Sequence, residues 1–525
     1  MRDAMNTTDS STILSNWLAR SAENRPQHLA IACNGLRWTF SELDRQATLL
    51  AEKFALAGIG AQSRIAVLTG SGLPYVACVH ALMRLKAILV PLNLRLTAQE
   101  LSWQLRDVQA IALLSDLAHQ DLARQLAQLL PDLPLGLLHH PSPEVGLTPL
   151  VDQQLPFSVR PVQSVAPLNW TINLADTQAI MYTSGTTGTP KGVVLTYGMH
   201  WWNAVGSALN LGHQLDDIWL ACMPLFHVGG LSILMRSVIN GISVILQEKF
   251  EPAVVNQTLI DEKVTIISVV AIMLQRMLAE LDTREPGGRY PEALRCVLLG
   301  GGPAPRPLLE DCASRKIPVV QTYGLTESAS QAVTLAPGDA LRKLGSAGRP
   351  LLPVQLSIRN EGQVAAPNEP GIICLKGPGI TPGYDHRPEA TAQAIVDGWL
   401  STGDIGYLDE EGYLYVLDRR SDLIISGGEN IYPAEIEAAL LAHPDVQEAG
   451  VCGQADTRWG QIPIAFVHLQ AQSVATAEQL LAYTEQRLAR YKVPRALYIV
   501  GPLPRNASGK LLRRELNKLR PPSSS

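Results

Sequence analysis

Short apolar runs alternate with amphipathic stretches through most of this chain, and this alternation limits the fold more than any other feature. Two of the intervening segments, 251–263 and 305–315, carry proline close to their starts, as the first turn of a helix allows. Apolar runs separated by helices are typical of α/β proteins with parallel sheets and right-handed crossovers. The predicted strands of this part are Ile218–Met223, Ile242–Gln247, Val264–Val270, Leu294–Leu299 and Ile317–Gln321.

The pattern changes near residue 405, where the apolar segments 406–408 and 412–417 flank Asp409-Glu410-Glu411-Gly412. This spacing predicts an antiparallel hairpin and, soon after it, a smaller α+β unit. Within that unit Pro433 should open a helix that ends before Pro444. Thr476 and Gln479 have the spacing of a capping box and predict a second helix.

Composition excludes several classes of protein. The chain has 525 residues, 46% of them hydrophobic, and a net charge of -5 with no block of like charges. A chain of this length can bury a large core, and nucleic acid is not an expected partner. We expect no integral membrane segment and a cytoplasmic location, because no apolar run is long enough for a span or a signal peptide. The seven cysteines are expected to be reduced core residues, because no two have metal-ligand spacing.

The most informative segment is Tyr182-Thr-Ser-Gly-Thr-Thr-Gly-Thr-Pro-Lys-Gly192, which follows the apolar strand 179–182. Glycines let backbone N–H groups approach an anion, while hydroxyls and one lysine add donors and charge. The segment is not a Walker A loop, because Pro190 replaces the second glycine and Gly192 replaces the magnesium-binding hydroxyl. It predicts a phosphate-binding loop whose contacts come from Thr183, Ser184, Gly185, Thr186, Thr187, Gly188, Thr189, Lys191 and Gly192.

This segment resembles the first motif of the superfamily of acyl- and aryl-CoA synthetases, adenylation domains and luciferases. Four further motifs of that superfamily follow in order, and the resemblance extends from about residue 13 to residue 516. Five ordered motifs make coincidence negligible. The four are Tyr323-Gly-Leu-Thr-Glu-Ser328, Ser401-Thr-Gly-Asp404, Asp418-Arg-Arg-Ser-Asp422 and Pro504-Arg-Asn-Ala-Ser-Gly-Lys510.

The resemblance implies a fold and a reaction. The expected fold is α/β: a large N-terminal AMP-binding domain, residues 1–420, of α/β subdomains with a distorted β-barrel, and a small mobile α+β C-terminal domain, residues 421–525. The expected reaction uses ATP, Mg²⁺ and CoA and passes through an acyl-adenylate. Oligomeric state stays open, with a homodimer among the alternatives.

The resemblance also implies roles for individual residues. Glu327 would bind Mg²⁺, which suits a hard cation held by one carboxylate and phosphates. Thr326 would bond the α-phosphate and Tyr323, with Gly324, would lie against adenine. Asp404 and Arg419 would bind ribose or phosphate. The turn of Gly300, Gly301, Gly302 and Pro303 would let the backbone reach the base, although three glycines after a strand also suit an ordinary tight turn.

Two faces of the C-terminal domain would serve the two half-reactions. Lys510 would bridge the carboxylate and the α-phosphate during adenylation. Gly427 and Gly428 belong to a glycine-rich segment that would line the path of the CoA thiol. Ser421 occupies the hinge position, where the superfamily more often has a charged residue.

Three stretches, 224–237, 268–277 and 421–437, resemble the o-succinylbenzoate–CoA ligases of menaquinone or phylloquinone biosynthesis. Their substrate is an aromatic carboxylic acid with a second carboxylate, which needs a cationic or hydrogen-bonding partner. His227 is expected to shape the acyl pocket and take part in catalysis. Arg236, Arg276, Ser268 and Gln275 are further candidates for contact with this acid. Each of the two arginines suits a surface ion pair equally well.

Other functions remain open from sequence alone. The same mechanism could act on another aryl or medium-chain acid, or load a carrier protein. A non-catalytic nucleotide-binding relative is disfavoured, because Lys191, Glu327, Asp404, Arg419 and Lys510 are all present.

Overall fold

The computed structural model describes residues 12–139, 145–149, 167–183, 190–302, 304–360, 362–419, 422–426, 429–456, 459–488, 490–506 and 509–521. Its largest sheet has nine strands, and within it the consecutive strands β2, β13, β12, β14, β15 and β16 run parallel to one another, as the apolar runs from residue 218 to residue 321 predicted. In sheet order the strands are β18 (Arg349–Pro350), β17 (Val333–Thr334), β16 (Val319–Tyr323), β15 (Cys296–Leu299), β14 (Ile266–Val269), β12 (Ile218–Ala221), β13 (Ser243–Leu246), β2 (Leu29–Cys33) and β3 (Leu36–Thr39).

One strand of this sheet runs further than the sequence predicted. The expected strand ended at Gln321, whereas β16 continues to Tyr323. The reason is β17, which pairs antiparallel with Thr322 and Tyr323 and therefore keeps both residues extended. Tyr323 is thus held at the carboxyl end of a central strand.

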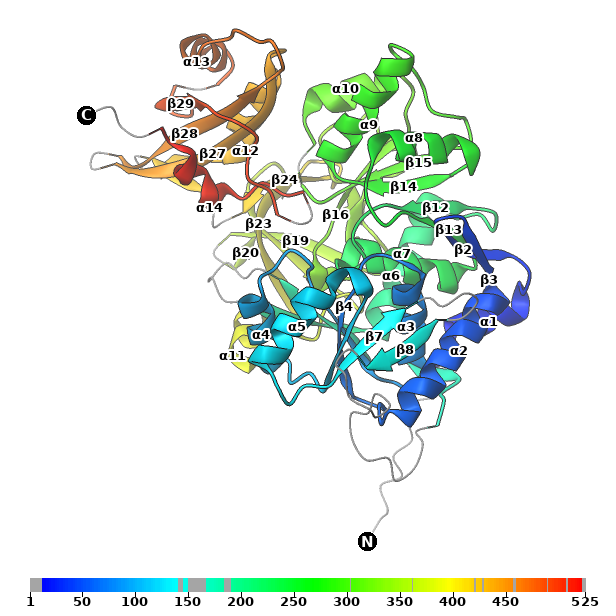
Figure 1. Ribbon diagram of the computed structural model, residues 1–525. Helices are drawn as coiled ribbons and strands as arrows, with labels where there is room; N and C mark the ends of the chain where they lie inside the picture. The colour runs from blue at the N-terminus through cyan, green and yellow to red at the C-terminus, as the bar shows by residue number, and fades with distance from the viewer. Residues whose placement is uncertain are drawn as a thin grey trace.

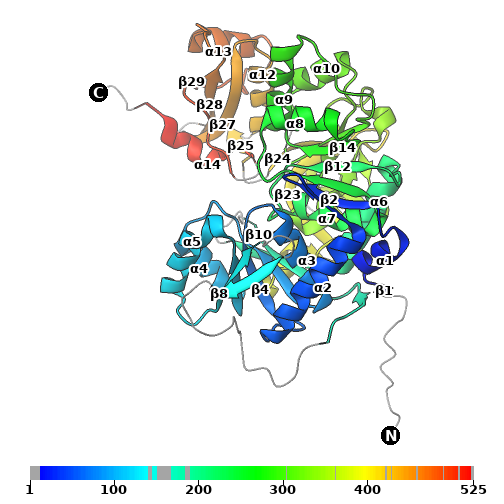
Figure 2. The same cartoon turned by 45° about the vertical axis from the view of Figure 1, so that its right-hand side comes forward.

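A second sheet of seven strands is also mostly parallel, with antiparallel strands at its two edges. Its strands β4 and β8 are labelled in Figures 1 and 2, in the blue and cyan region of the molecule. In order it contains β11 (Lys191–Thr196), β10 (Thr177–Thr183), β5 (Ile88–Pro91), β4 (Arg64–Leu68), β6 (Ala112–Ser115), β7 (Leu135–His139) and β8 (Gly146–Pro149). A short ribbon of β1 (Ile13–Ser15) and β9 (Thr171–Asn173) lies apart from both sheets.

The third sheet is antiparallel and comes from residues 355–419, within the expected N-terminal domain. Its hairpin pairs Leu408 with Leu414 around Asp409–Gly412, which confirms the predicted turn. The strands are β20 (Gln363–Val364), β19 (Gln355–Asn360), β21 (Gly371–Lys376), β23 (Trp399–Leu408), β22 (Ile395–Val396) and β24 (Leu414–Arg419).

The C-terminal part has a five-stranded sheet and hydrophobic clusters of its own. Both predicted helices are confirmed: α12 begins at Pro433, and α13 carries the capping box of Thr476 and Gln479. Drawn in orange and red, this unit lies beside α9 and α10 in both views (Figures 1 and 2). Its strands are β26 (Glu429–Ile431), β25 (Ile424–Ser426), β28 (Gly460–Leu469), β27 (Val446–Asp456) and β29 (Ala496–Ile499).

The helices connect and cover these sheets. None of those in the described ranges combines the length and apolar character needed to cross a membrane. They are α1 (Trp17–Asn24), α2 (Phe40–Leu56), α3 (Leu73–Arg84), α4 (Ala98–Asp107), α5 (Gln120–Leu129), α6 (Tyr197–Leu211), α7 (Val228–Asn240), α8 (Pro252–Asp261), α9 (Ala271–Arg284), α10 (Arg306–Ser314), α11 (Pro388–Ala394), α12 (Pro433–Leu441), α13 (Ala477–Glu485) and α14 (Arg513–Leu516).

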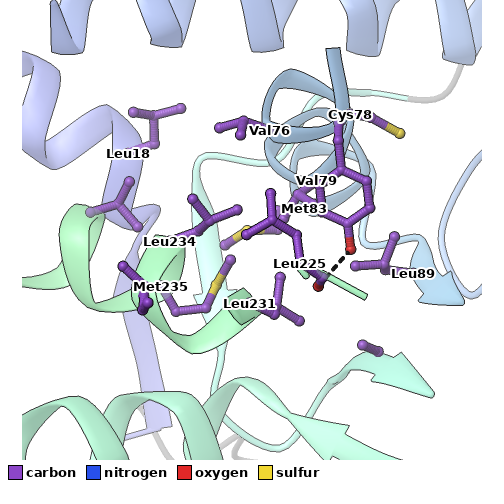
Figure 3. Packing of buried hydrophobic residues seen from close by; sticks show 14 of the residues in the cluster. Leu18, Val76, Cys78, Val79, Met83, Leu89, Leu225, Leu231, Leu234 and Met235 are labelled. Atoms are coloured by element: carbon purple, nitrogen blue, oxygen red, sulfur yellow. Dashed lines mark hydrogen bonds between the residues drawn. The ribbon is translucent and has the colours of Figure 1, made fainter. Parts of the chain in front are cut away.

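One hydrophobic core joins the two large sheets. Its members come from β4 and β12 as well as from α2, α3, α6 and α7. Figure 3 shows Val79 and Met83 of α3 close to Leu231 and Leu234 of α7. All seven cysteines are free and buried, as predicted. Because the two sheets share this core, loops at their carboxyl edges keep fixed positions relative to one another.

Candidate active site

The predicted site residues gather at the carboxyl ends of the parallel strands. His227 follows β12, Ser268 lies in β14, the Gly300–Gly302 turn follows β15, and Tyr323 ends β16. Open α/β sheets bind ligands at this edge. His227 and Tyr323 are 96 positions apart in the sequence, and they meet because the parallel strands place them at the same edge.

The predicted phosphate loop joins β10 to β11. These strands pair antiparallel, and Thr183 stands opposite Lys191 at the open end of the pair. The predicted contacts Ser184, Gly185, Thr186, Thr187, Gly188 and Thr189 lie outside the described residues. Gly192, expected to approach an anion, instead lies within β11, where a Cβ would come within 2.8 Å of Ile180. Packing against the neighbouring strand therefore explains this glycine.

A tyrosine that the sequence did not reveal lies between Lys191 and Glu327. The Tyr384 hydroxyl donates a hydrogen bond to Oε1 of Glu327 at 3.1 Å. The Lys191 ammonium lies over the Tyr384 ring, 5.2 Å from its centroid. Glu327 and Thr326 share a single 3₁₀ turn, Thr326–Ser328, just beyond β16. The first and second motifs therefore meet through one aromatic side chain.

The surroundings of Glu327 fit a magnesium ion that shares its ligands with a nucleotide. Within the described ranges no group of three or more His, Cys, Asp or Glu side chains could hold a metal. Mg²⁺ typically takes one or two carboxylates and completes its octahedron with phosphates and water. Glu327 would supply that carboxylate. When bound, the ion would neutralise charge on the phosphates.

Tyr323 and Asp404 form a direct pair. The Tyr323 hydroxyl donates to Oδ2 of Asp404 at 2.7 Å. Asp404 lies on β23, where its backbone stands opposite Arg419 of β24. The residues expected to bind adenine and ribose are therefore adjacent, as one nucleoside requires.

The backbone geometry explains why two of the predicted site residues, Gly324 and Gly301, are glycines. A Cβ on Gly324 would lie 1.5 Å from the carbonyl oxygen of Ser330, so only glycine fits there. Gly301 has a φ of +82°, a conformation that glycine adopts at little cost. Gly302 faces open space, and Pro303 lies outside the described residues. The tight-turn interpretation thus explains Gly301 without a ligand.

His227 caps α7 at the entrance to the predicted acyl pocket. Its Nε2 is buried and has no hydrogen-bond partner among the described residues. Burial, together with the positive charges of Arg95 and Lys510, lowers the pKa of His227 to about 4. The imidazole is therefore neutral near pH 7 and can pack against an aromatic acid or donate a hydrogen bond.

The loop before His227 is held through its backbone. The hydroxyl of Tyr75 donates to the Leu225 carbonyl oxygen at 3.2 Å, the bond drawn as a dashed line in Figure 3. The Leu225 amide in turn donates to the Ser71 hydroxyl at 3.1 Å. Gly230 packs so closely that a Cβ would lie 2.4 Å from the Pro224 carbonyl oxygen. These contacts fix the path of the loop and so the position of His227.

Lys510 faces the same region from the C-terminal unit. A bridge between Arg505 and Leu511 closes its turn, and its amide donates to Oδ1 of Asn506 at 2.8 Å. Arg95 of the large domain reaches the Asn506 carbonyl oxygen at 3.4 Å. Arg95, which the sequence did not single out, therefore lies where the two units meet.

Arg236 is buried with no carboxylate beside it. Only 1% of the residue is exposed, and no ion pair to it occurs in the described part of the chain. It donates to Oδ1 of Asn203 at 2.5 Å and lies 5.3 Å from the centroid of Trp219. Burial lowers its pKa to about 9, so the guanidinium stays charged at pH 7. A buried unpaired cation of this kind is costly unless an anion joins it.

The remaining pocket candidates separate in the structure. Ser268 accepts a hydrogen bond from the indole N–H of Trp219 at 3.0 Å. Because Arg236 also lies beside the Trp219 ring, Ser268 and Arg236 share this neighbour. Gln275 is partly exposed on α9. Arg276, in contrast, is exposed and lies over the Phe250 ring. The structure thus separates the two arginines that the sequence treated alike.

The hinge segment is tied to the C-terminal tail. Arg513 donates to Asp418 at 2.8 Å, to Asp422 at 2.9 Å and to Glu437 at 2.7 Å. Burial alone would lower the pKa of Arg513, but Glu437 and the two aspartates outweigh it and raise the pKa above its usual range. Ser421, Gly427 and Gly428 lie outside the described residues. Their roles remain predictions.

Comparison with known proteins identifies the family. Residues 18–385 match the model of the AMP-binding enzymes, and residues 435–510 match the model of the AMP-binding enzyme C-terminal domain. The chain belongs to the AMP-binding enzyme family. The unmatched interval between the two models contains β23, β24 and the hinge segment.

Curated members of the AMP-binding family resemble this chain over its whole length. It is 51% identical to 2-succinylbenzoate–CoA ligase of Geobacillus kaustophilus (strain HTA426) over 510 residues, 97% of this chain and 99% of that protein. It is 49% identical to the ligase of the same name from Geobacillus sp. (strain WCH70), covering 97% and 98%.

Solved structures of AMP-binding enzymes share the fold. The o-succinylbenzoate CoA synthetase of Bacillus subtilis in complex with its acyl-adenylate intermediate matches with a TM-score of 0.86 and 41% identity, covering 97% of this chain and 99% of that one. The same enzyme in complex with ATP and magnesium ion matches with a TM-score of 0.85 and 41% identity, covering 96% and 100%. The predicted adenylate-forming fold is confirmed.

Proposed function

We propose that this chain is an AMP-forming 2-succinylbenzoate–CoA ligase. The observation that carries the proposal is the 51% identity to a curated ligase of that name across 99% of its length. The predicted use of ATP and Mg²⁺ agrees with the related structure that holds both. CoA as the thiol substrate, a place in menaquinone or phylloquinone biosynthesis, and the cytoplasm as the location are parts of the same proposal.

In the first half-reaction one carboxylate of the acid attacks the α-phosphate of ATP and displaces pyrophosphate. Both the attacking oxygen and the phosphate are negative, so the step needs cations placed between them. Lys510 is proposed to lie between carboxylate and α-phosphate, and Lys191 to hold the leaving pyrophosphate. Thr326 would donate its hydroxyl to the α-phosphate. Tyr323 and Asp404 would fix the nucleoside.

In the second half-reaction the CoA thiol attacks the carbonyl carbon of the adenylate and releases AMP. The mixed anhydride is a good electrophile, so no further activation of the carbonyl is required. We propose that the C-terminal domain, with a boundary at 420/421, turns about Ser421 between the two steps. After this rotation Lys510 would lie away from the reacting groups. Gly427 and Gly428 would then line the path along which the CoA thiol reaches the adenylate.

The acid's second carboxylate needs a partner, and Arg236 is the proposed one. Its guanidinium is buried and charged and, among the described residues, faces no acidic side chain. Trp219 and Ser268 would line the same side of the pocket. His227, neutral and anchored, would lie against the ring or the reacting carboxylate. Gln275 is proposed as a peripheral contact.

An ATP–pyrophosphate exchange assay with purified protein tests the proposal. The acids would be o-succinylbenzoate, benzoate, coumarate, octanoate and amino acids, and mass spectrometry would identify the CoA product. We expect exchange to be strongest with o-succinylbenzoate and its CoA ester to form. Stronger exchange with a monocarboxylate would keep the adenylate mechanism and overturn the substrate. Sedimentation velocity on the same protein would decide whether it is a homodimer.

A further inference from the structure

Tyr384 contacts both of the residues that the first two motifs contribute to the phosphate end of the site. Its hydroxyl donates to Oε1 of Glu327 at 3.1 Å, and its ring faces the Lys191 ammonium at 5.2 Å. One side chain therefore contacts both the proposed metal ligand and the lysine of the predicted phosphate loop.

The backbone around Tyr384 is fixed on both sides. The Asp385 amide donates to the Gly192 carbonyl oxygen at 2.8 Å, and the Val194 amide donates to the Gly383 carbonyl oxygen at 3.1 Å. These bonds join the segment to β11. Asp385 also accepts two hydrogen bonds from Arg64, at 2.9 and 3.0 Å. The tyrosine therefore projects from a rigid support.

A second contact ties the same segment to the turn that carries Glu327. The Thr381 amide donates to the Glu327 carbonyl oxygen at 2.8 Å, and the Thr381 hydroxyl donates to the Val194 carbonyl oxygen at 2.7 Å. Thr381 is buried. Backbone and side chain of Glu327 are thus both held by residues 381–384, which join β11 to the 3₁₀ turn.

A carboxylate that binds one metal ion has two oxygens and can rotate between them. A hydrogen bond to one of these oxygens restricts the rotation of the carboxylate and so fixes its orientation toward the ion. Partners of this kind commonly change metal affinity 10- to 100-fold when they are removed. Lys191 over the same ring would keep its charge close to the phosphates that share the ion.

We propose that Tyr384 is a positioning residue: its hydroxyl orients the Glu327 carboxylate toward Mg²⁺, and its ring places the Lys191 ammonium beside the same phosphates. The proposal rests on the proposed role of Glu327 as the metal ligand. It assigns two separable tasks to one side chain, the hydroxyl for the metal and the ring for the lysine.

Metal titration tests the first task without the acid substrate. Binding of Mn²⁺ would be followed by electron paramagnetic resonance with an ATP analogue that has a methylene group between its α- and β-phosphorus atoms. In Tyr384→Phe we expect the Mn²⁺ dissociation constant to rise about tenfold. Glu327→Gln should raise it further. Unchanged Mn²⁺ affinity in Tyr384→Phe would overturn the proposal.

The second task is tested by comparing Tyr384→Phe with Tyr384→Leu. Phenylalanine keeps the ring under Lys191, so the KM for pyrophosphate in the exchange reaction should stay within twofold. Leucine removes the ring, and this KM should rise several-fold. Equal KM values for pyrophosphate in the two variants would show that the ring does not position Lys191.

Tyr290→Phe is the matched control, because its hydroxyl also donates to one side chain, Oδ1 of Asn256 at 2.9 Å, away from the site. It should leave the Mn²⁺ affinity and the KM for pyrophosphate unchanged. Thermal melts of every variant would confirm folding. The titration uses no acid, so its result does not depend on which acid is the substrate. A wrong substrate would appear only in the exchange screen, and a wrong role for Tyr384 would appear in the Mn²⁺ titration.

Discussion

The Tyr323 hydroxyl lies 2.7 Å from Oδ2 of Asp404 and joins the end of a parallel strand to the antiparallel third sheet. One residue of this pair is expected at adenine and the other at ribose. The bond therefore presets the spacing of two contacts before a nucleotide arrives.

This relationship predicts coupled effects on ATP binding. Asp404→Ala should raise the KM for ATP roughly 10- to 100-fold, because a charge-assisted hydrogen bond contributes about 1.5–3 kcal/mol. Tyr323→Phe should raise it less than tenfold, and the double variant less than the product of the two. Initial rates at varied ATP would measure this, with the KM for the acid as an unchanged internal control. Fully additive effects would mean that the bond has no role in binding.

Lys510→Ala should separate the two half-reactions. We expect adenylation to fall by at least a hundredfold, because the variant lacks the cation between two anionic groups. Attack of CoA on supplied acyl-adenylate should remain within a few-fold of the parent rate. Pyrophosphate exchange measures the first step and thioester formation from synthetic adenylate the second. Equal loss in both would contradict the assignment of Lys510 to adenylation alone.

Arg236→Met should change substrate preference. The KM for o-succinylbenzoate should rise roughly 10- to 100-fold, since the variant loses a charged hydrogen bond, whereas that for benzoate should change little. Arg276→Ala is the control, because Arg276 is exposed over Phe250. If both acids lose affinity equally, Arg236 supports the fold and does not bind the second carboxylate. Arg236→Lys, which keeps the charge, would show partial recovery if the charge is what matters.

Arg513→Ala should destabilise the C-terminal unit. It would leave Asp418, Asp422 and Glu437 without their common partner, and Asp418 is only 6% exposed. Breaking a buried ion pair typically costs about 3–5 kcal/mol. Hydrogen exchange of α12 and β27 would report the loss. Arg514→Ala, at an exposed neighbour, should change stability by less than about 0.5 kcal/mol; an equally small effect of Arg513→Ala would refute the expectation.

Acid should weaken the fold between about pH 6.5 and pH 4. Burial lowers the pKa of His80 and His200 to about 3 and that of His213 and His227 to about 4. Below their ordinary value of 6.5 the unfolded chain binds protons that the folded chain does not. Each histidine then lowers the free energy of unfolding by at most about 1.4 kcal/mol per pH unit. Urea midpoints at pH 7.5 and 5.0 would measure this, and a midpoint that rises at pH 5.0 would contradict it.

Local sequence patterns predicted the helices, strands and turns well, because each pattern depends on residues that are close together along the chain. The parallel strands around Leu220 and Ile267, the hairpin at Asp409 and the capping box at Thr476 are all confirmed. The predicted end of β16 was wrong, because pairing with Val333 extends the strand to Tyr323.

The site was predicted only where motifs exist. Tyr384 touches Glu327, which is 57 positions away, and Lys191, which is 193 positions away, so no spacing could suggest the contact. Arg95 was missed for the same reason: its partner Asn506 lies in the other unit. Arg236 and Arg276 have similar sequence surroundings, and only tertiary burial separates them.

The loop that carries His227 is anchored through the amide and carbonyl of Leu225, by Ser71 and Tyr75, and not through the His227 side chain that we propose to face the acid. We therefore expect substitutions at His227 to alter which acid is accepted while the loop keeps its course. The backbone path of this loop and the choice of acid can therefore change independently of each other. A designer seeking a ligase for a new aromatic acid would vary His227 and leave Ser71 and Tyr75 intact.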